Sequence, residues 1–266
     1  MQYIFYISTY TRHVLKKCFP SHIPPNTYNQ FVNQSTNICT SVKNKMKLLI
    51  SALTKYLAGI TLMGALIFLP AGTLRWSNAW LLMAILFIPM LLMGIIMYIK
   101  SPELLAKRLN NKEKRSEQKS VVALSALIFI GGFIIAGLNH RFGWLTLPNY
   151  ITHIFATIFT IGYALYAEVM RENTWLSRTI EIQHNQTVVS TGLYSIVRHP
   201  MYMATILMYL SIPLILNSIL SLAIFLLYLP IIARRINDEE QLLNTQLPGY
   251  TEYCAQVRWR LIPFIY

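Results

Sequence analysis

Charge is scarce in this sequence, and acidic charge is the scarcest. Of 266 residues only 12% are Asp, Glu, Lys or Arg, and only 10 are acidic. A soluble domain carries about 25% charged residues, so the composition argues against a soluble protein, and the 55% hydrophobic share excludes a disordered chain. The three cysteines form no CxxC pair and no zinc spacing, which excludes a disulfide scaffold. The histidines have no ligand spacing either, so we expect no metal.

The charge that is present is strongly one-sided. The chain has 23 Lys and Arg, and its formal net charge is +13. A chain that is both basic and hydrophobic is typical of a membrane protein with cationic flanks, and it argues against nucleic-acid binding. The sequence also lacks a GxGxxG motif, so no nucleotide-binding fold of the soluble type is predicted.

Four runs with little or no charge are long enough to cross a bilayer, which takes about 20 apolar residues. They cover residues 48–70, 80–99, 121–138 and 150–167. Lys55 is the single charge within the first run, and its long aliphatic stem can carry the ammonium group toward the interface.

A fifth run, residues 201–233, contains 33 residues without a charge. As one helix it would measure about 50 Å, whereas the hydrocarbon core is about 30 Å thick. Pro213, Asn217 and Ser218 lie in the middle of the run, where such residues favour a turn. We therefore predict two short helices in a tight hairpin, with one long tilted helix as the alternative. The predicted fold class is an all-α integral membrane protein with about six transmembrane helices.

The distribution of basic residues predicts the orientation. With six spans, every Lys and Arg except Lys55, Arg75 and Arg141 falls in segments on one side of the membrane. Because cytoplasmic loops carry an excess of Lys and Arg, we expect a multi-pass protein with both termini in the cytoplasm. Topology then explains the positive charge without an anionic partner.

Three regions follow from this pattern. Residues 1–45 are polar and basic, and we predict an N-terminal extension that is poorly ordered. Residues 46–170 hold four transmembrane helices. Residues 171–266 hold the hairpin at 201–233 and a cytoplasmic C-terminal helix.

Polar residues on both sides of the hairpin carry the chemistry. Pro200 has a fixed φ and no amide donor, so it suits the first position of a helix and leaves Arg198 and His199 at the helix N-terminus. Anions such as carboxylates dock at helix N-termini. After the hairpin, Arg235 and Glu239 are four residues apart and face the same side of a helix. The hairpin would bring these two groups of residues together in one pocket.

Each residue taken alone has an ordinary explanation. Arg198 and Arg235 could be positive-inside anchors, and Glu239 and Glu240 could form helix ion pairs with arginines. His199 could be a hydrogen-bonded interfacial residue. The ordered combination around a short hairpin favours a pocket.

The same residues resemble a known family. The Arg-His-Pro-Met-Tyr sequence at residues 198–202, preceded by Gly192-x-Tyr194, resembles the cofactor motif of the isoprenylcysteine carboxyl methyltransferase family. The Arg-x-x-x-Glu-Glu-x-x-Leu segment at residues 235–243 and the tail from Pro248 to Pro263 match as well. Related membrane phospholipid methyltransferases share this pattern.

The resemblance implies that residues 171–266 are a cofactor-binding region, with a site for S-adenosylmethionine on the cytoplasmic side of the membrane. The implied cofactor contacts are Gln183, Gln186, Thr187, Val188, Val189, Tyr194, His199, Pro200, Met201, Tyr202, Glu239 and Glu240. Arg235 matches the arginine on the substrate side, and Arg235 and Arg198 are the candidate catalytic residues.

The implied function is transfer of a methyl group to a lipophilic small-molecule or lipidated acceptor, most simply an isoprenylcysteine carboxylate, and membrane lipids are the other expected partners. The nearest alternative is N-methylation of a phospholipid amine, which needs a base such as His199 or Tyr202. An NADPH-dependent enzyme of the sterol-reductase type is another, with Arg234, Arg258 and Arg260 available for a 2′-phosphate. A non-catalytic scaffold is disfavoured by the intact motif. The sequence carries no signal for an oligomeric state.

Overall fold

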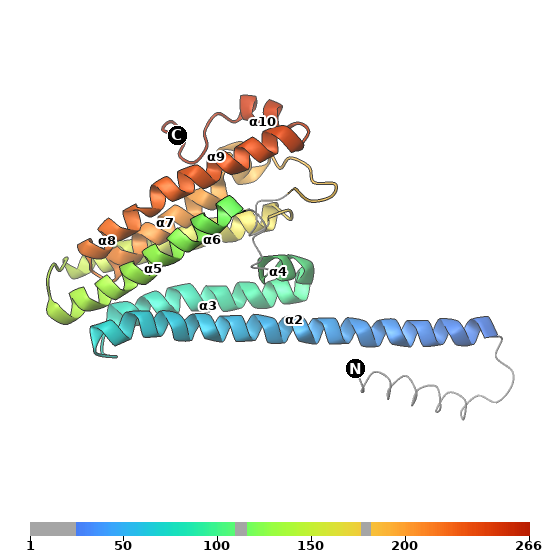
Figure 1. Cartoon of the computed structure of the whole chain (residues 1–266), viewed down its shortest axis with the longest axis horizontal. Helices are drawn as coiled ribbons and strands as arrows, with labels where there is room; N and C mark the ends of the chain where they lie inside the picture. Colours follow the sequence, from blue (N-terminus) through green and yellow to red (C-terminus); the bar gives the residue numbers. More distant parts are fainter. Residues whose placement is uncertain (1–24, 110–115, 177–181) are drawn as a thin grey trace. The chain divides into compact units, whose positions relative to one another are not determined.

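The computed structural model describes residues 25–109, 116–176 and 182–266, with the side chains of 40–109, 121–176 and 182–266. Within this part of the chain all regular structure is helical (Figure 1), which confirms the all-α membrane fold. The helices are α2 (Pro25–Ala71), α3 (Ser77–Lys100), α4 (Pro102–Leu109), α5 (Ser116–Phe142), α6 (Asn149–Glu172), η1 (Gly192–Ser195), α7 (Pro200–Ile215), α8 (Ile219–Leu226), α9 (Tyr228–Gln246) and α10 (Tyr250–Gln256).

Five helical stretches are long and apolar enough to cross a membrane. They are Thr40–Ala71, Ser77–Lys100, Val121–Phe142, Asn149–Glu172 and Ile219–Gln246. The remaining predicted span, the first helix of the hairpin, is the apolar helix α7, which has only 16 residues. Large aliphatic side chains on the outside of these helices are exposed, including Leu69 at 75% and Ile99 at 72%. An apolar surface of this kind suits lipid rather than water.

The chain divides into two units, one up to Leu53 and one from Thr54 onward. The first contains the N-terminal part of α2. Residues 25–45 of the predicted extension are helical. Propagation of an existing helix adds one hydrogen bond per residue, so a transmembrane helix can continue into a polar segment. The rest of the predicted extension, residues 1–24, lies outside the described residues.

The predicted hairpin is present, and the alternative of one long helix is not. Helix α7 ends at Ile215 and α8 begins at Ile219, after a turn in which Asn217 adopts a φ of 59°. The side-chain amide of Asn217 donates to the carbonyl of Leu147 at 2.7 Å, and its Oδ1 accepts from the Leu147 amide. Ser218 caps α8 by accepting from the amide of Ser221 at 3.2 Å. The turn is thus fixed to the loop between α5 and α6.

The ends of the helices in the second unit differ in character. The hairpin turn lies at one end, and α4, the segment before α7 and α10 lie at the other (Figure 1). A core that includes Ile67, Leu82, Phe159 and Phe225 packs between the helices. Helices α5 and α8 approach closely at Gly132, whose carbonyl accepts from Ser221 Oγ at 2.8 Å. The polar motifs therefore sit at one end of an apolar bundle.

Gly132 and its neighbour Gly131 give a matched pair of variants. A Cβ added at Gly132 would lie 2.3 Å from Cε2 of Phe225, which is fully buried, whereas nothing lies within 4 Å of a Cβ at Gly131. We expect Gly132→Ala to destabilise the fold by about 1–3 kcal/mol through overpacking. Gly131→Ala should leave stability unchanged or slightly raised. Thermal unfolding in detergent checks both, and equal melting temperatures for the two variants would contradict the α5–α8 contact.

Candidate functional site

The segment that precedes α7 is shaped by a glycine. Gly192 begins η1 with a φ of 51°, and a Cβ placed there would lie 1.5 Å from Oε1 of Glu172. The other carboxylate oxygen of Glu172 accepts from the amide of Leu193 at 3.0 Å. The chain can therefore turn against the end of α6 only with glycine at this position.

The C-terminal tail holds the start of α7 in place. The amides of Arg198 and His199 donate to the carbonyls of Trp259 and Arg260, each at 2.9 Å. As predicted, Pro200 occupies the first turn of α7 and His199 stands immediately before it. The tail thus fixes the residues at the N-terminus of this helix by backbone hydrogen bonds.

Glu240 is the centre of a buried charge cluster. Its Oε1 accepts from Arg198 Nε at 2.7 Å and lies 3.1 Å from His199 Nε2, while its Oε2 lies 2.7 Å from Arg260 Nη2. Its side chain is 7% exposed. Both oxygens of this predicted cofactor contact are therefore occupied by protein groups, and Glu240 holds three segments together.

The guanidinium of Arg198, a candidate catalytic residue, is largely engaged in structural hydrogen bonds. Besides its bond to Glu240, its Nη1 donates to the carbonyls of Val257 at 3.0 Å and Arg258 at 3.2 Å. Such charge-assisted bonds fix a guanidinium in one orientation. Arg198 lies at the cavity wall, where it is suited to positioning.

A second chain of polar contacts links Glu239, Tyr202 and Arg235. The hydroxyl of Tyr202 donates to Oε2 of Glu239 at 2.5 Å and accepts from Nε of Arg235 at 3.1 Å. Tyr202 belongs to α7, and its two partners belong to α9. The hairpin therefore brings the two motifs together as predicted.

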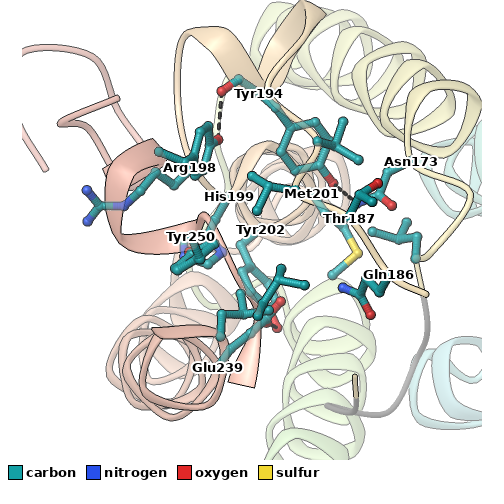
Figure 2. Close-up of a pocket in the computed structure, with 16 residues that line it drawn as sticks. Asn173, Gln186, Thr187, Tyr194, Arg198, His199, Met201, Tyr202, Glu239 and Tyr250 are labelled. Carbon is teal, nitrogen blue, oxygen red and sulfur yellow. Dashed lines mark hydrogen bonds between the residues drawn. The ribbon is translucent and has the colours of Figure 1, made fainter. Parts of the chain in front are cut away.

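A pocket of about 580 Å³, its open mouth included, lies between these segments. Figure 2 shows the polar side chains around it. The predicted residues that line it are Gln186, Thr187, Val188, Val189, Tyr194, Arg198, His199, Met201, Tyr202 and Glu239. Gln183, Pro200, Arg235 and Glu240 are not among its lining residues. The structure thus gathers most of the predicted site, and its occupant stays a prediction.

Six lining residues were not predicted. They are Asn173, Leu176, Leu243, Leu247, Tyr250 and Tyr253. Three of them, Leu243, Tyr250 and Tyr253, belong to the motifs that carried the resemblance and could have been added on that ground. Asn173 donates to the hydroxyl of Tyr194 at 2.9 Å, and no local sequence pattern marks it.

The phenol groups of the pocket stay protonated at neutral pH. Burial, together with the carboxylates of Glu239 and Glu172, raises the pKa of Tyr194 to about 12. Burial, with the nearby carboxylate of Glu240, raises the pKa of Tyr250 well above its usual range. Neither phenol can therefore act as a base near pH 7.

The hydroxyl of Tyr250 also has no hydrogen-bond partner among the described residues, although it is buried. A buried polar atom without a partner costs about 1–3 kcal/mol. The pocket wall therefore has an unmet hydrogen-bonding capacity that a polar ligand could satisfy.

Comparison with known proteins places this site in a family context. The model of the isoprenylcysteine carboxyl methyltransferase (ICMT) family matches residues 155–245. Delta(14)-sterol reductase TM7SF2 of Mus musculus is 31% identical over 91 residues, which are 33% of this chain and 22% of that protein. The chain thus matches about a fifth of the length of this curated relative.

A solved structure shares the fold of nearly the whole chain. The eukaryotic intramembrane Ras methyltransferase ICMT matches with a TM-score of 0.53 and 18% identity, over 98% of this chain and 95% of that one. The region of the family match runs from α6 into α9 and includes both motifs on either side of the hairpin. Residues 155–245 are thus similar to the isoprenylcysteine carboxyl methyltransferase family, and the fold of nearly the whole chain is similar to that of the solved ICMT structure.

Proposed function

We propose that this protein is an integral membrane enzyme that transfers a methyl group from S-adenosylmethionine to the carboxylate of a lipophilic acceptor of the isoprenylcysteine type. The observation that carries the proposal is the pocket between the segment before α7 and the C-terminal half of α9, which gathers most of the predicted cofactor residues. The distribution of Lys and Arg supports a cytoplasmic location for the pocket and for both termini.

The pocket residues fit S-adenosylmethionine in their chemistry. Glu239 is a carboxylate at the wall, suited to accept hydrogen bonds from ribose hydroxyls, and Val188, Met201 and Leu243 supply apolar surface. The unsatisfied hydroxyl of Tyr250 offers a further donor to a polar ligand.

The protein's own residues would mainly align the reactants. When bound, S-adenosylmethionine supplies a methyl group on a positively charged sulfonium. A carboxylate acceptor is already ionised near pH 7, so no side chain has to remove a proton from it. Arg235 would hold the carboxylate by a charge-assisted bond, and its bond to Tyr202 fixes the guanidinium. Alignment of this kind supplies a large part of catalysis.

An amine acceptor fits the pocket less well, because it must lose a proton before it is methylated. The hydroxyl of Tyr202 already donates to Glu239, and Nε2 of His199 lies against Glu240. Tyr194 and Tyr250 stay protonated. The phenol of Tyr202 is thus engaged and the other phenols are too weakly acidic to serve as bases, which favours the carboxylate.

The sterol-reductase relative makes NADPH the second candidate ligand. A 2′-phosphate would need free cationic side chains. Arg260, one of the three candidates, already contacts Glu240, Asn237 and the hydroxyl of Tyr266. This occupation removes one of the three candidate cations for a 2′-phosphate.

Calorimetry with the purified protein in detergent tests the proposal. We expect S-adenosylmethionine and S-adenosylhomocysteine to bind with micromolar affinity, and NADPH neither to bind nor to compete. Binding of NADPH in place of S-adenosylmethionine, or binding of neither, would contradict the proposal.

A further inference from the structure

The short helix α4 lies outside the family match, yet its last residues contact elements around the pocket. Lys107 Nζ donates to Oε1 of Gln183 at 2.6 Å and lies 6.0 Å from the ring centroid of Trp175. Arg108 donates to the hydroxyl of Tyr166 in α6. Helix α4 is thereby tied to α6 and to the segment that leads into the pocket.

Helix α4 also contacts a lysine within the first transmembrane helix, α2. Lys55 Nζ donates to the carbonyl of Leu109, the last residue of α4. The carbonyl end of a helix carries partial negative charge and attracts cations. The one charge inside the first predicted span thus has a structural partner, and it fixes α4 to α2.

Gln183 connects α4 to the segment that lines the pocket. Its Nε2 donates to the carbonyl of Trp175 at 2.5 Å, and its amide donates to Oε1 of Gln186 at 2.9 Å. The amide of Gln186 in turn donates to the carbonyl of Gln183 at 3.1 Å. Gln186 and the three residues after it line the pocket, whereas Gln183 does not. Both polar atoms of the Gln183 side chain are thus used to hold the segment.

We propose that α4 positions the pocket segment of residues 183–189, and that Lys107 is a positioning residue for the cofactor site. The ammonium group holds Gln183, and Gln183 holds Gln186 in the wall. This inference rests on the proposed function for the identity of the ligand. The contact between Lys107 and the segment is independent of that identity.

The variants Lys107→Met and Lys100→Met form a matched pair. Lys100 is exposed at the end of α3, so its substitution removes the same charge without removing a contact to Gln183. Hydrogen exchange of the ligand-free protein should be at least about fivefold faster at the amides of residues 183–186 in Lys107→Met. Lys100→Met should match the wild type.

Ligand binding gives the second measurement. We expect Lys107→Met to weaken S-adenosylmethionine binding about tenfold, within the usual range for coupling between sites, while kcat at saturating cofactor and the melting temperature stay close to wild type. Lys107→Arg should restore most of the affinity. Because Lys107 acts through Gln183, adding Gln183→Ala to Lys107→Met should cause little further loss.

The two readouts separate the inference from the proposed function. Unchanged exchange at residues 183–186 in Lys107→Met would overturn the positioning role, whatever the wild type binds. Faster exchange in Lys107→Met, together with a wild type that binds no S-adenosylmethionine, would instead overturn the proposed function. The positioning role of α4 would then still hold.

Discussion

Arg235→Met is expected to lower kcat/KM for a carboxylate acceptor by about 100-fold or more, while the Kd for S-adenosylmethionine stays within about twofold of wild type. The guanidinium is the candidate clamp for the carboxylate, and losing one partner of a close charge pair costs about 2–5 kcal/mol. Arg235 is absent from the pocket lining, so cofactor binding should be spared. Methyl-transfer kinetics and calorimetry on the same preparation measure the two effects.

Two further variants control this result. Arg234→Met removes the adjacent, exposed arginine and should behave like the wild type. Arg235→Lys keeps the charge but lacks the planar fork of donors, and it should recover only part of the activity. If Arg234→Met and Arg235→Met lose activity equally, the loss reflects general charge and the acceptor role assigned to Arg235 is wrong.

Substitution of the two adjacent glutamates in α9 is expected to affect different properties: stability for Glu240 and ligand affinity for Glu239. Glu240→Ala should destabilise the fold by about 3–5 kcal/mol, because removal of one partner from a buried ion pair leaves uncompensated charge. Arg198, His199 and Arg260 all depend on this carboxylate. The melting temperature of Glu240→Ala in detergent should therefore fall by several degrees.

Glu239→Ala should instead affect the ligand. Its carboxylate is at the pocket wall and accepts a hydrogen bond from the hydroxyl of Tyr202. We expect the affinity for S-adenosylmethionine to fall at least tenfold, with a change in melting temperature much smaller than that of Glu240→Ala. A large stability loss in Glu239→Ala with unchanged ligand affinity would reverse the assignment of the two carboxylates.

Much of the architecture could be predicted because membrane helices are marked by local composition. Runs without charge located the spans, and Asn217 in the middle of the last run marked the hairpin turn. The start of α2 at Pro25 was missed, because a polar segment continues a helix that begins in the membrane. Helix propagation of this kind leaves no apolar pattern in the sequence.

Only part of the site could be predicted from the sequence motifs. The residues before and after the hairpin could be placed in one pocket because the hairpin returns the chain to the same end of the bundle. The use of Glu240 by Arg198 and Arg260, and of Gln183 by Lys107, depends on partners 42, 20 and 76 positions away in the chain. Neighbouring residue types carry no information about such contacts. Which of the lining residues bind the cofactor stays a prediction.

Transfer of a labelled methyl group tests the central claim most directly. The protein, reconstituted in lipid, is incubated with methyl-labelled S-adenosylmethionine and either a prenylated cysteine with a free carboxylate or a phospholipid with a primary amine headgroup. We expect label in the prenylcysteine product and none in the phospholipid. Base should release this label, as expected of a methyl ester. Base-stable label in the phospholipid, with none in the prenylcysteine, would contradict it.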